Sequence, residues 1–293
     1  MHAPAPPTRS APVWETARGP VHLDRPCIFG ILNITPDSFW DGGRHAGVDA
    51  AIAHAAALLE QGADVIDVGG ESTRPGALPV PADEELRRVL PVVRELVRRW
   101  PDLVISVDTV KAEVARAALA EGAAVINDVS GLRLDPGLGQ VVAEAGAGIV
   151  LMHSRGPVDQ MASYELARYG PDPVGDIVRE LAEAMERARA TGIASAAVVL
   201  DPGLGFSKRT EHSAAAIARL DRILALGRPV LVGPSRKRFV GELAGGLPVE
   251  ERLEPTIAAC IVALLRGARL FRVHDVRAVR RALTVAEALL DTP

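Results

Sequence analysis

Short apolar runs alternate with amphipathic stretches along most of the chain. Eight of these runs are rich in β-branched residues and almost free of charge, a pattern typical of parallel strands that are buried on both faces. We therefore predict a strand in each of them. The predicted strands cover residues 27–32, 65–68, 103–107, 124–126, 148–152, 197–200, 229–232 and 270–273.

The segments between the runs carry apolar residues three and four positions apart, which predicts amphipathic helices. Glycine stands at positions 62, 122, 146 and 192, each time between a predicted helix and the next strand, where glycine commonly ends a helix. The clearest apolar stripes are Val48, Ile52, Ala55 and Leu59; Leu86, Val89, Leu90, Val93 and Val97; Val174, Ile177, Val178, Leu181 and Met185; and Val276, Val279, Leu283 and Ala286.

Eight strand–helix units follow one another without a linker. This count favours an α/β fold of one domain, a closed (β/α)8 TIM barrel, over an open doubly wound sheet. Residues 1–12 are rich in Pro and Ala and are predicted to form a disordered tail, which leaves 13–293 as the barrel domain. The segment 12–26 precedes the first strand and is a candidate for a short hairpin that closes the bottom of the barrel.

The composition narrows the function classes. Of the 293 residues 48% are hydrophobic but only 3% are aromatic, so the core must be aliphatic. A formal net charge of −4 argues against a protein that coats nucleic acid. Cys27 and Cys260 are far apart and form no CxxC pair, so we expect reduced thiols in the cytoplasm. No window has the roughly 18 consecutive apolar residues of a membrane span, and no membrane partner is expected.

Polar residues follow every predicted strand. In a barrel of this kind the loops after the strand ends build the active site. One Asp or Asn at such a position is usually a helix N-cap, but eight in register are hard to explain in that way, and a Lys or Arg cannot cap an N-terminus. The polar positions are Asn33, 67–74, Asp108, Asn127 with Asp128, His153, Asp201, 235–237, and Arg272 with His274.

Two of the predicted loops are long and rich in Gly and Pro, at 33–43 and 69–81. Long loops on a compact barrel usually act as lids or ligand clamps. The alternative is that both are tolerated surface insertions. We interpret them as parts of the site, because each begins at a polar strand end.

The cations at the strand ends predict an anionic ligand. Arg74, Lys237, Arg272 and His274 can converge on a diphosphate, since guanidinium groups match phosphate oxygens. The histidines show no HxH or HExxH spacing, so a transition-metal site is not expected.

The oxygen-bearing side chains predict two further contacts. Asn33 and Asp41 offer hard ligands that suit Mg²⁺ bridging phosphates. Asp108, Asn127 and Asp201 offer donors and acceptors for the edge of a flat, amino-substituted heterocycle. From the residues alone we expect a phosphorylated substrate with a polar planar ring.

Several longer segments then add a specific resemblance, which extends from about residue 30 to residue 276. In them the chain resembles the dihydropteroate synthases, which fold as (β/α)8 barrels and are usually homodimers. The segments are GILNITPDSFWDGG (30–43), DVGGESTRPGA (67–77), SVDT (106–109), INDV (126–129), DPGLGFSK (201–208), SRK (235–237) and FRVHDV (271–276).

The resemblance implies a transferase that condenses 6-hydroxymethyl-7,8-dihydropterin diphosphate with p-aminobenzoate, giving 7,8-dihydropteroate and diphosphate with the help of Mg²⁺. It implies pterin contacts by Asp108, Asn127, Met152, Asp201, Lys237 and Arg272. It implies p-aminobenzoate contacts by Phe39, Thr73, Pro75, Phe206 and Ser235. It implies diphosphate contacts by Asn33, Asp41, Thr73, Arg74, Arg272 and His274, with Asn33 on the metal. The catalytic residues that the resemblance implies are Asp108, Asp201, Lys237 and Arg272.

The family is thought to react by an SN1-like loss of diphosphate, which implies a cationic methylene group that the carboxylates Asp108 and Asp201 would favour. Two alternatives stay open at this point: a methyltetrahydrofolate-dependent methyltransferase, and an inactive paralogue that binds pterin. Trp40 stands where many relatives have a small residue, and it either narrows the p-aminobenzoate site or points outward. Ser207 replaces the usual Gly of the GFGK motif.

Overall fold

The computed structural model describes residues 12–34, 44–72 and 78–290. Eight parallel strands form one sheet in the order β8-β7-β6-β5-β4-β3-β10-β9. A parallel bridge between Leu200 and Val230 joins the two end strands, so the sheet closes into the predicted (β/α)8 barrel. The strands are β3 (Cys27–Asn33), β4 (Val65–Gly69), β5 (Val104–Asp108), β6 (Val125–Asp128), β7 (Gly148–Met152), β8 (Val198–Asp201), β9 (Leu231–Val232) and β10 (Leu270–Val273).

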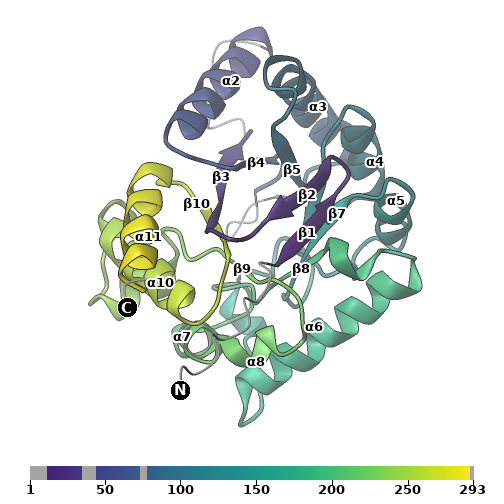
Figure 1. Ribbon diagram of the computed structural model, residues 1–293. Coiled ribbons are helices and arrows are strands. Elements are labelled where there is room, and N and C mark those ends of the chain that lie inside the picture. The colour runs from purple at the N-terminus through teal and green to yellow at the C-terminus, as the bar shows by residue number, and fades with distance from the viewer. Residues whose placement is uncertain (1–11, 35–43, 73–77, 291–293) are drawn as a thin grey trace, which may run out of the picture.

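Helices surround the barrel (Figure 1). No helix in the described ranges is long and apolar enough to cross a bilayer. The four glycines predicted to end helices all have a positive φ, between 59° and 104°. The helices are α2 (Arg44–Glu60), α3 (Ala82–Arg99), α4 (Ala112–Ala120), α5 (Leu138–Glu144), η1 (Tyr164–Leu166), α6 (Pro173–Ala190), η2 (Ser195–Ala197), α7 (Thr210–Ala218), α8 (Leu220–Leu224), α9 (Arg238–Leu243), η3 (Val249–Glu251), α10 (Leu253–Leu265) and α11 (Val276–Leu290).

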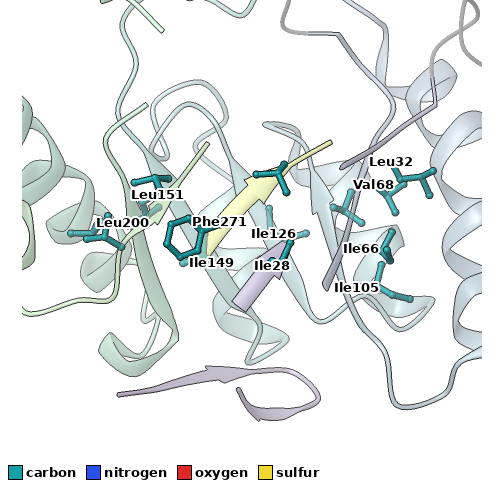
Figure 2. Close-up of a cluster of buried hydrophobic side chains, with 14 of the residues drawn as sticks. Ile28, Leu32, Ile66, Val68, Ile105, Ile126, Ile149, Leu151, Leu200 and Phe271 are labelled. Atoms are coloured by element: carbon teal, nitrogen blue, oxygen red, sulfur yellow. The ribbon is translucent and has the colours of Figure 1, made fainter. Parts of the chain in front are cut away.

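Alternate residues of each strand point to opposite faces of the sheet, and the two faces differ in chemistry. The outward residues are aliphatic or aromatic and pack against the helices, as Ile66, Ile126 and Leu200 illustrate (Figure 2). The inward residues near the start of the strands are apolar, and Phe29 and Val150 among them belong to a separate core cluster. Towards the strand ends most inward positions become polar, although Ile31 and Met152 stay apolar, so the upper half of the barrel can bind a polar ligand.

A hairpin of β1 (Val13–Thr16) and β2 (Gly19–His22) lies across the bottom of the barrel (Figures 1 and 2). The predicted hairpin is therefore confirmed. The Trp14 side chain is fully buried, and its Nε1 donates to the carbonyl oxygen of Ala197 at 2.8 Å. A Cβ at Gly148 would lie 3.0 Å from the indole, so glycine at the start of β7 makes room for the ring. This plug keeps water out of the lower core.

Candidate active site

Eight of the sequence-predicted site residues line one small cavity at the carboxyl ends of the strands. The barrel geometry brings them together, because consecutive parallel strands end at the same rim. Met152 lies beside the cavity in a buried cluster that Phe206 touches. The eight lining residues are Asp108, Asn127, Asp201, Phe206, Ser235, Lys237, Arg272 and His274.

Asn33 ends β3 on the same rim. A Cβ built at Gly69 would lie 3.5 Å from Asn33 Oδ1 and 3.7 Å from Asp108 Cβ, so the amide oxygen and the carboxylate are close neighbours. Other predicted positions fall outside the described residues, and the structure places none of them. These are Phe39, Trp40, Asp41, Thr73, Arg74 and Pro75.

Asp67 is a central residue to which the sequence analysis gave no role of its own, because it was grouped with the polar segment 67–74. Its carboxylate is fully buried at an inward position of β4 and accepts from three side chains. Ser106 Oγ donates to Oδ1 at 2.6 Å, while Oδ2 accepts from Asn127 Nδ2 at 3.2 Å and from Arg272 Nε at 2.6 Å. The sequence did contain a sign of this role, because Asp67 is an acidic residue inside the apolar run VIDV (65–68). An acidic residue in a buried strand is best explained by a polar layer of side chains that point into the barrel.

Arg272 also donates from Nη2 to Asp108 Oδ2 at 2.8 Å, so one guanidinium group bridges two carboxylates. Burial raises the pKa of Asp108 to about 7, against the opposing effect of Arg272, and the nearby Asp67 charge adds to the rise. Burial would lower the pKa of Arg272, but the two carboxylates hold it above its usual value. Arg272 is thus a permanent cation, whereas Asp108 changes charge near neutral pH.

Asp201 and Lys237 form the second charged group of the cavity. Asp201 Oδ1 accepts from the backbone N–H of Gly203 at 2.7 Å, and burial raises its pKa against the pull of Lys237. Burial lowers the pKa of Lys237 to about 8, and Asp201 opposes that fall. Lys237 Nζ also lies 4.3 Å from the centre of the Phe206 ring. The cavity wall therefore offers both donors and acceptors, which recognition of a polar ring requires.

Ser235 contacts His274 twice. Its hydroxyl oxygen accepts from the His274 backbone N–H at 3.1 Å and lies 3.0 Å from Nδ1. The Ser235 hydroxyl therefore links both the backbone and the ring of His274. A predicted p-aminobenzoate contact therefore also orients a predicted diphosphate contact.

Ser207 stands where the motif usually has Gly, and its backbone has a left-handed φ of 48°. That conformation is strained for a residue with a Cβ. The side chain compensates, because its Oγ accepts from the Arg155 backbone N–H at 2.9 Å and lies 3.1 Å from the Met161 carbonyl oxygen. The substitution is thus accommodated by local hydrogen bonds.

Residues 29–274 match the model of the pterin binding enzyme family. The chain is 44% identical to the dihydropteroate synthase of Mycobacterium leprae over 90% of this chain and 93% of the relative. Among solved structures, a dihydropteroate synthase of Xanthomonas albilineans with 4-aminobenzoic acid is 47% identical, with a TM-score of 0.88 over 97% of this chain and 100% of that chain. A second structure of the Xanthomonas albilineans enzyme, in complex with 7,8-dihydropteroate, is 45% identical, with a TM-score of 0.85 over 96% and 100% of the two chains.

Proposed function

The chain belongs to the dihydropteroate synthase family, and from that premise we propose how its residues carry out the family's reaction. The enzyme is a transferase that joins 6-hydroxymethyl-7,8-dihydropterin diphosphate to p-aminobenzoate, releasing diphosphate and 7,8-dihydropteroate. The observation that carries the assignment of roles is the convergence of eight predicted residues, from strands far apart in sequence, on one charged cavity.

The pterin ring occupies the deepest part of this cavity. Asp108, Asn127, Asp201 and Lys237 pair with the polar edge of the ring, and Arg272 lies against its face. Asp67 supports this assignment, because it orders Arg272 and Asn127 without itself reaching the cavity lining. Met152 supplies apolar contact beneath the ring.

The diphosphate binds at the rim, against Arg272 and the imidazole of His274. Asp41, Thr73 and Arg74 are predicted from the sequence to bind the diphosphate as well, and they lie outside the described residues. Mg²⁺ fits here as an ion carried by the substrate, because it commonly uses one or two protein oxygens and the phosphates themselves. Asn33 would hold it; no group of three His, Cys, Asp or Glu in the described residues forms a cage. When bound, the ion stabilises the charge of the departing diphosphate.

p-Aminobenzoate lies between Phe206 and the segment that begins at Ser235. Phe39, Thr73 and Pro75 frame it as predictions on residues beyond the described ranges. The Phe206 ring already faces Lys237, so the aniline would lie next to the pterin site. The amine nitrogen then lies close to the methylene carbon that it attacks.

The reaction breaks one C–O bond and forms one C–N bond. Diphosphate leaves from the methylene carbon with the bonding electrons, and the pterin ring delocalises the positive charge. The carboxylates of Asp108 and Asp201 stabilise that positive charge. Arg272 and Lys237 stabilise the negative charge on the leaving group and on the ring oxygen. The amine attacks and then loses a proton. Cys27 and Cys260 are buried free thiols, and burial raises the pKa of both, so neither is a nucleophile.

We also propose that the enzyme is a cytoplasmic homodimer. The apolar surface supports this, because large apolar side chains are exposed along two adjacent helices, α10 and α11. An exposed apolar strip of this kind is typical of an interface. A Val262→Asp, Leu265→Asp double variant should sediment as a monomer if the strip is the dimer contact. The strip consists of Val262, Leu265, Val285, Leu289 and Leu290, each between 43% and 72% exposed.

Diphosphate release tests the assigned roles directly. The wild type is given the pterin diphosphate and Mg²⁺, with and without p-aminobenzoate, and is compared with Asp201→Asn. Release should depend on p-aminobenzoate and should fall about 100-fold or more in the variant, the usual scale for loss of a charge-stabilising group. Asp102→Asn, a change at an exposed position, is the matched control. Equal rates in the wild type and Asp201→Asn would overturn the role of Asp201.

A further inference from the structure

A fully buried lysine lies directly behind the site, and the reaction as described does not use it. Lys208 Nζ donates to His153 Nδ1 at 2.7 Å, to the Phe206 carbonyl oxygen at 3.0 Å and to the His153 carbonyl oxygen at 3.3 Å. These three contacts surround the amino group, and burial lowers its pKa well below the usual value for a lysine. Burying such a group is costly, so its presence demands a reason beyond packing.

His153 connects the lysine to a carboxylate. Its Nε2 lies 3.0 Å from Glu180 Oε2, and a carboxylate only accepts, so Nε2 carries the proton and Nδ1 accepts from Lys208. Burial, together with the lysine charge, lowers the pKa of His153 to about 3 and keeps the ring neutral. Glu180 is also held by Arg155, whose Nε donates at 3.0 Å. A neutral histidine thus connects the buried lysine to a carboxylate on α6.

This relay holds the loop between β8 and α7, which directly follows Asp201 and carries Phe206. The backbone N–H of His153 donates to the Asp201 carbonyl oxygen at 2.8 Å. A Cβ at Gly203 would come within 2.0 Å of the His153 carbonyl oxygen, so the loop rests directly on this residue. Lys208 binds the carbonyl of Phe206, the residue whose ring faces the cavity. The position of the ring is therefore coupled to the lysine.

We propose that Lys208, with His153 and Glu180, is a positioning residue that sets where Phe206 meets p-aminobenzoate. The inference rests on the proposed contact between Phe206 and that substrate. A displacement of about 1 Å in such a wall costs up to about 100-fold in rate. If packing alone mattered, an unbranched apolar side chain would serve as well or better, as replacements of buried ion pairs show.

The first test is Lys208→Met, which keeps the length of the side chain and removes its donors. The KM for p-aminobenzoate should rise about tenfold or more, equal to 1.4 kcal/mol of lost binding, while the thermal midpoint stays within a few degrees of the wild type. A variant that folds with an unchanged KM overturns the proposal, as does a lower midpoint without any kinetic change.

A second variant changes a residue further from the loop, and it tests the same proposal if Lys208→Met fails to fold. Glu180→Gln keeps an acceptor for His153 but removes the charge, and should raise the same KM by a smaller factor. Glu183→Gln is the matched control, because Glu183 lies exposed on the same helix and its ion pair is with Arg179 rather than with His153 or Arg155. Equal behaviour of the two glutamine variants counts against the relay.

A double-mutant cycle with Phe206→Ala separates the positioning role of Lys208 from the contact between Phe206 and p-aminobenzoate. If Lys208 acts through Phe206, the added Lys208→Met change should alter the KM less than about twofold in the Phe206→Ala background. Additive effects overturn the proposal. Failure of the underlying substrate contact looks different, since Phe206→Ala alone would then leave the KM for p-aminobenzoate unchanged.

Discussion

Arg272 on β10 and Asp67 on β4 form an ion pair at the centre of the barrel mouth, with Nε 2.6 Å from Oδ2. The Asp67 side chain is fully buried, whereas that of Arg272 is 21% exposed towards the cavity. The carboxylate therefore serves as a fixed anchor, and the guanidinium group presents its remaining surface to the ligands. Ser106 and Asn127 donate to the same carboxylate, so several functional groups depend on one acidic residue.

Asp67→Ala should remove the anchor for all three donors. Breaking a buried pair by deleting one partner costs about 3–5 kcal/mol of unfolding free energy, and kcat/KM should fall by at least about 100-fold. Urea denaturation and steady-state kinetics measure the two effects. Asp102→Ala at the surface should change neither. A stable, active Asp67→Ala enzyme would remove Asp67 from the site.

Lys237 predicts a loss of activity in mild alkali. Burial lowers its pKa to about 8, so the cation that we propose to pair with the pterin disappears as the pH rises above 8. The kcat/KM of the wild type should decline through that range. Lys237→Arg keeps its charge and should lack this decline, although its overall rate will be lower because the guanidinium geometry differs. A wild-type profile that stays level to pH 9.5 is incompatible with this assignment.

The raised pKa of Asp108 predicts that the free energy of unfolding depends on pH. Its folded pKa of about 7 exceeds the usual value of 3.8, so the folded state keeps a proton that the unfolded state loses. Stability should therefore fall as the pH rises from about 4 to about 7, by at most about 1.4 kcal/mol per unit, and change no further from this group above that range. The difference in unfolding free energy between Asp108→Asn and wild type should grow in favour of the variant over the same window. A flat difference curve would contradict the raised pKa.

The hairpin plug should matter for stability and not for chemistry. Trp14→Ala empties space between β1 and the base of the barrel, where the indole stacks on Phe29 with ring centres 6.0 Å apart. The expected loss is about 3–5 kcal/mol, seen as an earlier thermal or urea transition, with both KM values unchanged. Val13→Ala on the same strand, at a 38% exposed position, is the control and should be nearly neutral.

The barrel could be predicted from the sequence because its strands are short apolar runs with polar residues at or soon after their ends. The ends differ by a residue or two, and β9 is shorter than predicted, since Pro229 has no N–H to donate to a neighbour. The inward-facing layer was harder to predict. Asp67 was grouped with the loop that follows it, because only the strand register decides that it points inward with Ser106.

Lys208 escaped prediction for a different reason. Nothing near it in sequence suggests burial, because its main partner, His153, lies 55 residues earlier. A lysine at the end of a Gly-rich motif reads as a surface or ligand-binding charge. Its role emerges only once the fold has placed the ends of β7 and β8 side by side.

The way in which the barrel closes has a consequence for its local opening motions. β9 has only two residues, and the bridge from Leu200 to Val230 joins it to β8, whereas the other neighbouring strands share longer ladders. Amide hydrogens along this seam should exchange with solvent sooner than those of β4 and β5. Asp201 ends one side of the seam, and the segment leading to Lys237 follows the other. Transient opening would therefore widen the ligand cavity while the plugged base stays intact, and ligands bound across the seam should slow that exchange.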